Sequence, residues 1–257
     1  GFGNAGVKPE GQSINYDAAT ETFTARYTHE TLALAFSITE EAIEDNLYDR
    51  LASRYTKALA RSMANTKQVK AANVLNNGFD GNFAGGDGVS LFGNNAGGAI
   101  VNHPTLAGTF SNQLQTPADL NETSLEQSLI DISAFTDERG LKIAARGMKM
   151  IIHPNQQFTA ERLMESKGRT GTADNDINAL VSRGMVPQGY VINHYVTDTD
   201  AFYIKTDVPN GMKMFNRSPI KTSMEGDFDT GNVRYKARER YSFGFSDPRG
   251  IYASAGA

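Results

Sequence analysis

Residues 37–78 read SITEEAIEDNLYDRLASRYTKALARSMANTKQVKAANVLNNG, and no proline or glycine interrupts them before Gly78. Ser37 and Glu40 have the S-x-x-E spacing of a capping box, in which the two side chains satisfy free backbone N–H groups of the first helical turn. Asn76-Asn77-Gly78 is typical of a helix end. At a rise of 1.5 Å per residue, a helix over this interval reaches roughly 60 Å. The stretch therefore predicts one long helix.

The apolar side chains of this helix recur at every fourth residue. Because an α-helix has 3.6 residues per turn, such a stripe drifts by about 40° per step around the axis. A drifting stripe suits a spine helix that crosses several neighbours in succession, and an ordinary solvated amphipathic helix is the alternative. The stripe consists of Ile43, Leu47, Leu51, Tyr55, Leu59 and Met63.

The charges of the same helix are segregated along its axis. Carboxylates occupy the first third and basic side chains follow, an order that complements the helix macrodipole. The acidic residues are Glu40, Glu41, Glu44, Asp45 and Asp49, and the basic ones are Arg54, Lys57, Arg61, Lys67 and Lys70.

The totals of the chain exclude several classes of protein. Its 257 residues suffice for one large domain or two smaller ones, and its net charge of -4 gives no global attraction to nucleic acid or acidic lipid. Without cysteine there is no disulfide, thiol nucleophile or thiolate metal site. No apolar run approaches a membrane span, so no membrane partner is expected. Because the chain begins at Gly1 without a leader, we expect that an upstream segment was removed or left out.

The first 36 residues predict an arm followed by a hairpin. Residues 1–15 are glycine-rich, and the G-x-G-x-x-G that they contain lacks the preceding strand that a dinucleotide site needs. Alternation on both sides of the turn Asp17–Thr20 predicts a long hairpin between Ser13 and Phe36. A two-stranded ribbon is marginal in isolation, so it needs a surface to lie on, such as that of a neighbouring subunit.

A glycine-rich loop follows Gly78, and an α/β pattern starts at Asp119. The loop contains Asp80-x-Asn82, the opening of a calcium loop, but the later ligand positions fail. Thr123 and Glu126 predict the capping box of the next helix. Beyond it the pattern predicts a strand at 148–153, a helix around 158–164, a mobile polar segment at 167–176 and short strands at 190–196, 201–205 and 212–215.

The interval 233–245 has the sharpest charge pattern in the chain. Apolar residues alternate with Arg234, Lys236, Arg238 and Arg240, which predicts a strand with one basic face. Carboxylates of a neighbouring element are commoner partners of such a row than phosphates. If the row meets the acidic start of the spine helix, within or between subunits, reversal of its charge should weaken assembly and reversal at Asp45 or Asp49 should partly restore it.

No catalytic centre emerges from the residues. The four histidines, His29, His103, His153 and His194, have no metal-ligand spacing, and neither a G-x-S-x-G elbow nor a phosphate loop occurs. A glycosidase pair of carboxylates assembles only in space, and the sequence leaves that open. The sequence predicts a protein that is not an enzyme, with no catalytic residue, no cofactor and no metal site.

The order of these parts resembles the major capsid proteins of tailed bacteriophages of the Hong Kong 97 type. The resemblance covers most of the chain beyond Ser13. It includes the amino-acid sequences of four stretches: ITEEAIEDNLYDRLASRYTKALARSMANTKQVKAANVLNNGF, HPTLAGTFSNQL, GTADNDINAL and MEGDFDTGNVRYKARERYSFGFSDPRG. It implies an α+β phage capsid fold with an extended N-terminal arm, a long β-hairpin called the E-loop, a spine helix in a peripheral domain and an α/β axial domain.

The resemblance also implies the organisation of the chain. Residues 1–36 would form the arm and the extended hairpin loop, and residues 37–118 the peripheral domain with its spine helix and Gly-rich loop. Residues 119–215 would form the axial domain, and residues 216–257 would return to the peripheral domain. Some relatives crosslink a lysine to an asparagine, but the hairpin region offers only Lys8 and no asparagine follows Asn232, so that chemistry is not expected.

The implied function is a head protein that self-assembles into hexamers and pentamers of an icosahedral shell enclosing phage double-stranded DNA. Its location would be the virion capsid, after assembly in the host cell cytoplasm. Its partners would be copies of itself, scaffolding, portal and decoration proteins, and packaged DNA in non-specific contact. The candidate subunit-interface residues are Tyr16, Arg26, Tyr27, Asp45, Asp49, Arg234, Lys236, Arg238 and Arg240.

Two alternatives stay open. The first is that the chain is a shell protein of the same fold that encloses protein cargo instead of DNA. Analysis of the packaged content would distinguish the two. A soluble carbohydrate-active or ligand-binding α/β domain is the alternative from another class. It predicts a deep pocket with perturbed carboxylates in the monomer.

Overall fold

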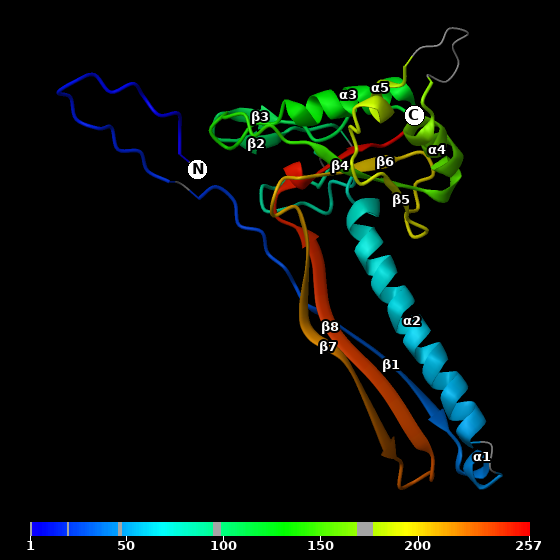
Figure 1. The fold of residues 1–257 in the computed structure, drawn as a ribbon. Coiled ribbons are helices and arrows are strands. Elements are labelled where there is room, and N and C mark those ends of the chain that lie inside the picture. Colours follow the sequence, from blue (N-terminus) through cyan, green and yellow to red (C-terminus); the bar gives the residue numbers. More distant parts are fainter. Residues whose placement is uncertain (1, 20, 46–47, 95–98, 169–176) are drawn as a thin grey trace. The chain divides into compact units, whose positions relative to one another are not determined.

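The computed structural model describes residues 2–19, 21–45, 48–94, 99–168 and 177–257 (Figure 1). The chain divides into two compact units. Unit 1 contains Gly1–Arg26, Asn73–Met212 and Phe245–Ala257, and unit 2 contains Tyr27–Ala72 and Lys213–Gly244. Each unit has its own sheet and its own hydrophobic core.

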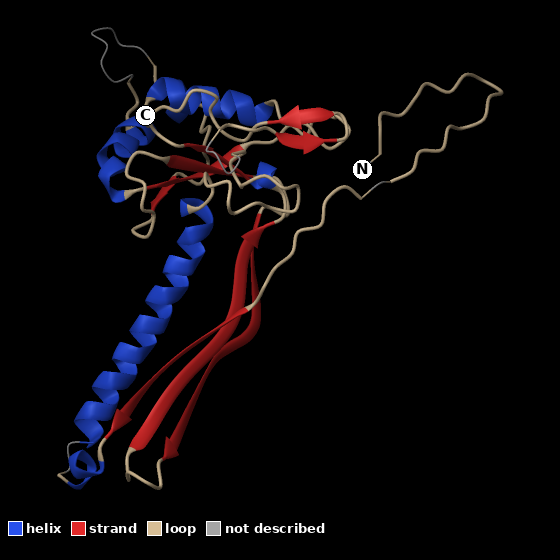
Figure 2. Cartoon of the chain, turned by 180° about the vertical axis from the view of Figure 1, so that it is seen from behind, coloured by secondary structure: helices blue, strands red, loops and turns tan. Residues whose placement is uncertain are grey.

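Unit 2 is built on a three-stranded sheet in the order β1-β8-β7. Its strands are β1 (Glu30–Ile38), β7 (Met212–Gly226) and β8 (Val233–Phe245), and β7 and β8 form a long hairpin (Figure 2). β1 pairs with β8 in antiparallel register, with Phe36 opposite Tyr235 and Ser37 opposite Arg234. Since side chains alternate between the faces of a strand, each such pair lies on one face and the next pair on the other.

Two helices follow β1, where the sequence predicts one. They are α1 (Glu40–Glu44) and α2 (Tyr48–Asn76), so the prediction of a single helix from Ser37 is wrong in its first part. Pairing with β8 holds Ser37 in a strand, and the residue before α1 is Thr39, whose side chain makes no capping hydrogen bond. The predicted end is confirmed at Asn76. With 29 residues, α2 is about 43 Å long.

α2 packs on the sheet of unit 2 through part of the predicted stripe. Leu59 and Met63 are buried against Ala237 of β8, with Leu32 and Phe36 of β1 packed around them. Tyr55 is 42% exposed, although its ring meets the edge of Phe36. Leu47 of the stripe lies outside the described residues.

The N-terminal arm forms no strand in the part that the structure describes. The hairpin predicted between Ser13 and Phe36 is therefore wrong in the described residues up to Tyr27, whereas its last part, Leu32 to Phe36, is confirmed as a strand within β1. The arm exposes its apolar side chains, and Tyr16 is 98% exposed. Without such burial, nothing offsets the conformational entropy that ordering a ribbon costs.

Unit 1 is built on a four-stranded mixed sheet in the order β5-β4-β6-β9. The strands are β4 (Gly147–Ile152), β5 (Tyr190–Ile192), β6 (Phe202–Thr206) and β9 (Ile251–Ser254), with β4 and β5 parallel and the other pairs antiparallel. The sheet has a core on each face, because consecutive residues of β4 and β6 belong to different clusters.

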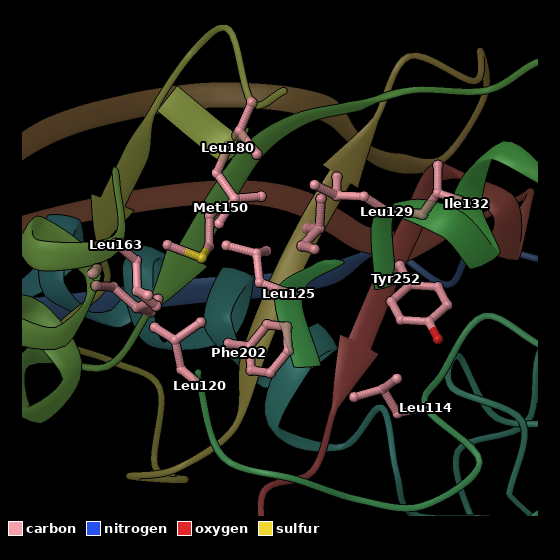
Figure 3. Packing of buried hydrophobic residues seen from close by; sticks show 14 of the residues in the cluster. Leu114, Leu120, Leu125, Leu129, Ile132, Met150, Leu163, Leu180, Phe202 and Tyr252 are labelled. Carbon is pink, nitrogen blue, oxygen red and sulfur yellow. The ribbon is translucent and has the colours of Figure 1, made fainter. Parts of the chain in front are cut away.

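Helices α3 (Glu122–Ser133), α4 (Gln157–Glu165) and α5 (Ala179–Ser182) contribute to the larger core. In Figure 3, Leu125 of α3 lies between Met150 of β4 and Phe202 of β6, and Leu129 lies beside Ile132. α3 begins with a capping box between Asn121 and Ser124, so the helix is confirmed while the predicted box of Thr123 and Glu126 is wrong. The Asn121 carboxamide accepts from the Ser124 N–H at 2.8 Å, so Asn121 is the N-cap and Thr123 already lies in the first turn of α3.

The second face of this sheet is covered by the end of α2 and the loop that follows it. Leu75, Leu91 and Phe92 pack there against Tyr203 and Ile251. α2 thus serves the core of unit 2 with its middle and a core of unit 1 with its last turn. This division agrees with the predicted spine helix, but the unit 1 contact is made by Leu75, which lies outside the predicted stripe, whereas the buried stripe residues Leu59 and Met63 pack in unit 2.

The remaining elements are short. β2 (His103–Thr105) and β3 (Gly108–Phe110) form a hairpin, and two 3-10 helices, Pro154–Gln156 and Pro248–Gly250, are present. The predicted strand at 233–245 is confirmed as β8, but that at 212–215 is too short because β7 continues to Gly226. Most of the polar segment 167–176 lies outside the described residues. In the described part of the chain, no helix combines the length and apolarity that a membrane span requires.

Candidate assembly surfaces

The basic row predicted on the last long strand lies on one face of β8. Lys236 and Arg238 are exposed and alternate with the buried Ala237 and Glu239. α2 packs on the face that carries Ala237. The basic row therefore lies on the face of the sheet that is turned away from α2.

The neighbouring strand β1 leaves this row uncovered. Thr31, Ala33 and Ala35 lie directly opposite Arg240, Arg238 and Lys236. Directly paired residues of antiparallel strands share a face, so the basic groups have only small side chains beside them on β1. β1 supplies no carboxylate to this face.

The strand on the other side, β7, adds basic side chains to the same face. The Ser246 N–H donates to the Gly211 carbonyl at one end of the hairpin, and the Asp227 N–H donates to the Asn232 carbonyl at the other. At both ends an odd-numbered residue before the turn lies across from an even-numbered one after it. The register shifts by two residues between these ends, which leaves odd opposite even, so alternation from either end places the odd-numbered residues of β7 with the basic row. They include Lys213, Arg217 and Lys221, and also one carboxylate near the turn, Glu225.

An aromatic contact confirms which way β7 faces. The rings of Tyr27 and Phe215 lie 4.7 Å apart, edge to face. Tyr27 also covers Gly244 of β8, because a Cβ on that glycine would lie 2.8 Å from the Tyr27 ring. Phe215 therefore lies on the even-numbered face of β8, as the backbone hydrogen bonds indicate.

Six basic side chains of this face have no ion pair with any residue that the structure describes. Arg234, at the hairpin turn, is different because it pairs with Asp227. The six are called the basic sheet face here: Lys213, Arg217, Lys221, Lys236, Arg238 and Arg240.

A compact acidic group occurs in the same unit. α1 and its C-cap expose four carboxylates, and the chain has no Lys or Arg between Thr39 and Asp49. These carboxylates form no ion pair within the described residues, so the predicted pairing of the acidic segment with the basic row is not made within the chain there. The acidic helix consists of Glu40, Glu41, Glu44 and Asp45.

Two ion pairs connect α2 to the sheet. Lys67 Nζ lies 3.1 Å from Glu239 Oε2, with side-chain exposures of 31% and 5%, whereas Lys70 pairs with Glu30 at 2.6 Å with exposures of 40% and 58%. Lys67 Nζ also lies 4.9 Å from the centroid of the Tyr241 ring. Burial, and then the negative charge of Glu239, raises the pKa of Tyr241.

A clamp holds the arm to the loop after α3. Both oxygens of Asp17 accept from Arg139 Nη1 at 2.8 and 2.9 Å, and Arg139 Nη2 donates to the Ala18 carbonyl. The Gly3 N–H donates to Asp17 at 2.7 Å. This bond and the Arg139 hydrogen bond hold the pKa of Asp17 below its usual range.

Two carboxylates of unit 1 with shifted pKa values, Asp87 and Asp198, lie apart from the pocket at the start of α3. Burial raises the pKa of Asp87, but hydrogen bonds from the buried His103 and the Val89 N–H outweigh it and leave that pKa lowered. Burial, and a hydrogen bond shared with Asp200, raises the pKa of Asp198. Neither group lines the open pocket of about 620 Å³ at the start of α3. Within the described residues, no three metal-binding side chains gather.

The other predicted interface residues lie apart from one another. Tyr16 and Arg26 are exposed on the arm, and Tyr27 is half-buried between Gly244 and Phe215. Asp45 is exposed at the end of α1, and the side chain of Asp49 lies outside the described residues.

Sequence reasoning missed the three basic residues of β7. Their four-residue spacing, Lys213, Arg217 and Lys221, is the signal that was present. It is weak as a strand signal because β7 exposes both faces, so apolar residues such as Met214 and Ile220 interrupt the alternation of polarity.

Comparisons with known proteins agree with this architecture. A family described as phage capsid protein matches residues 21–254. No curated protein matches the chain. The solved capsid of an empty GTA particle is 13% identical with a TM-score of 0.59, covering 99% of this chain and 81% of that one. The capsid of cyanophage P-SCSP1u is 13% identical with a TM-score of 0.56, covering 100% and 81%.

A third solved structure, the capsid of Myoviridae phage XM1, is 14% identical with a TM-score of 0.54, covering 100% of this chain and 82% of that one. At such identities the structures establish the fold, and the family match establishes membership. Capsid proteins of this family are structural shell proteins and not enzymes. The chain belongs to the phage capsid protein family and is a major capsid protein of the Hong Kong 97 type, the subunit of an icosahedral shell.

Proposed function

We propose that copies of this chain assemble as hexamers and pentamers into a shell that encloses phage double-stranded DNA. One observation supports this most: the chain holds surfaces that its described residues leave without a partner. They are the basic sheet face, the acidic helix and the exposed apolar side chains of the arm, such as Tyr16. A monomer has no use for them, whereas repetition in a shell supplies each with a neighbour.

The arm takes the role of the element that overlaps an adjacent subunit. Tyr16 and Arg26 are exposed for that contact, and Tyr27 anchors the arm where the sheet of unit 2 begins. Apolar side chains on an extended segment gain burial only when they reach another surface. In this proposal residues 119–215 supply most of the domain nearest the capsomer axis.

The same proposal includes assembly in the host cell cytoplasm, with scaffolding, portal and decoration proteins as partners. Packaged DNA would meet the inner surface of the shell through non-specific phosphate contacts, which weaken as salt concentration rises.

The test is the content of purified particles. Particles formed in infected cells are treated with nuclease, opened, and analysed for nucleic acid and for protein other than this chain. The proposal predicts nuclease-protected double-stranded DNA. Particles that hold a protein cargo and no protected DNA would contradict it.

A further inference from the structure

We propose that the basic sheet face of one copy is the docking site for the acidic helix of a second copy. This inference rests on the proposed function, because it names one of the contacts by which the shell would form. It adds the residues on both sides of that contact and the direction in which the contact propagates.

Both surfaces carry several charged groups. The six side chains of the basic sheet face and the four carboxylates of the acidic helix form no ion pair within the described residues. Arg217, Lys221, Lys236 and Arg238 are exposed, as are all four carboxylates. Opposite charges of this kind bring two copies together and fix their register.

The spacing of the two sets is similar. On a helix, residues four apart are separated by about 6 Å along the axis, which describes Glu40 with Glu44 and Glu41 with Asp45. On a strand, residues two apart are separated by about 6.8 Å, which describes Lys236 with Arg238. Two carboxylates on one side of the acidic helix therefore match two successive basic groups of β8.

The face is also accessible to a helix. The β1 residues beside the basic row are Thr31, Ala33 and Ala35, which do not project beyond the long basic side chains. A helix laid on the sheet there meets small side chains below and flexible cations beside it. Lys and Arg extend their charged groups past such surfaces while their stems pack on them.

An acidic segment of this chain fits better than DNA. The net charge of the chain is -4, so its overall field repels a polyanion as large as DNA. A short helix with four carboxylates needs only the local basic face. Its carboxylates in turn have no basic neighbour between Thr39 and Asp49 to pair with.

The contact joins two different surfaces of the same chain. Such a heterologous contact leaves an acidic helix free on one copy and a basic face free on the other, so it repeats until a ring closes. This is the behaviour that a capsomer requires.

The experiment uses two charge-reversed forms of the full chain. Lys236→Glu with Arg238→Glu reverses the face, and Glu41→Lys with Asp45→Lys reverses the helix. Alone, each form sets like charges against each other, and we expect the concentration at half-assembly to rise about tenfold or more. Mixed in equal amounts, each form complements the other, and we expect assembly to return toward that of the wild type.

Lys57→Glu with Arg61→Glu is the matched control, since it makes the same change of charge on exposed positions of α2. Circular dichroism verifies that every form is folded, and light scattering measures assembly. A mixture that assembles no better than either form alone overturns the inference. So does a face-reversed form that assembles normally but loses nuclease-protected DNA, because the face then binds nucleic acid.

The controls also separate this inference from the proposed function. A wild-type chain that never forms particles contradicts the proposed function, and the inference with it. Wild-type particles together with unaffected reversed forms contradict the inference alone.

Discussion

The pairing of Lys67 with Glu239 predicts a large effect for a change of one charge on α2. Lys67→Met keeps most of the aliphatic stem and removes the ammonium group, which leaves the Glu239 carboxylate with 5% of its surface exposed and no counter-charge from α2. Lys70→Met makes the same change one turn on, where Glu30 is 58% exposed. The two variants differ mainly in the burial of the carboxylate that loses its partner.

Burial sets the magnitude of each effect. Removing one partner of a fully buried pair costs about 3–5 kcal/mol, and an exposed pair contributes under about 1 kcal/mol. Lys67 is 31% exposed, so water reduces the cost, whereas the lost contact with the Tyr241 ring adds about 0.5–1 kcal/mol. We expect about 2 kcal/mol for Lys67→Met and under about 1 kcal/mol for Lys70→Met.

Hydrogen exchange of the β8 amides is the suitable assay, because a chain with two units need not unfold in one step. At about 2 kcal/mol, amides beside Glu239 exchange about thirtyfold faster in Lys67→Met, and less than about fivefold faster in Lys70→Met. Adding Glu239→Gln to Lys67→Met should recover much of the loss, since a neutral amide is cheaper to bury. Equal effects of the two lysine variants would refute the reasoning.

Three further predictions follow from single sites. The pKa of Asp17 is lowered, so its clamp stabilises the attachment of the arm fully above about pH 3.8 and is lost as the pH falls through the lower folded-state pKa. Proteolysis of the arm should therefore accelerate on acidification, and it should also accelerate at neutral pH in Asp17→Asn. Gly231→Ala should destabilise the hairpin turn by about 1 kcal/mol or more, because the φ of Gly231 is +65° and a carboxylate of α1 occupies the position of the added Cβ. Gly226→Ala should not destabilise the protein, since nothing lies near its Cβ position, and thermal melting compares the two variants. Burial and the hydrogen bond to Asp131 raise the pKa of Tyr252 far above its usual value. Absorbance titration should show that this phenol stays neutral until the protein unfolds. The contribution of Tyr252 to stability should be lost progressively above about pH 10.

Where one face of an element is buried within the chain, the sequence predicts it well. β8 has its predicted bounds because α2 covers one of its faces, and burial there enforces the alternation that 233–245 displays. The same holds for α3, whose Leu125, Leu129 and Ile132 contact the sheet of unit 1. The family, which the resemblance predicts, is confirmed by the match over residues 21–254.

The errors fall where a long-range pairing or a missing neighbour decides the structure. Ser37 has the spacing of a cap, but pairing with Arg234 holds it in β1. The arm alternates like a strand, yet in the described residues no partner strand accompanies it. β7 is longer than predicted. Because both of its faces are exposed, its residues do not alternate between polar and apolar, and the sequence pattern does not indicate its pairing with β8.

The candidate assembly surfaces were only partly predicted, because some of their residues are brought together by long-range strand pairing. The basic row of β8 stands out because buried residues separate its members, whereas the basic residues of β7 need the hairpin to place them on the same face. The arrangement of Lys236 and Arg238 opposite the small residues of β1 depends on a register that only the structure gives.

Self-assembly is the central claim, and the mass of the purified full-length chain tests it most directly. Light scattering over a range of concentrations, with electron microscopy of the same fractions, should show hexamers, pentamers or closed shells that increase with concentration. A chain that stays monomeric at every concentration, with its arm as resistant to proteolysis as its core, would contradict the account.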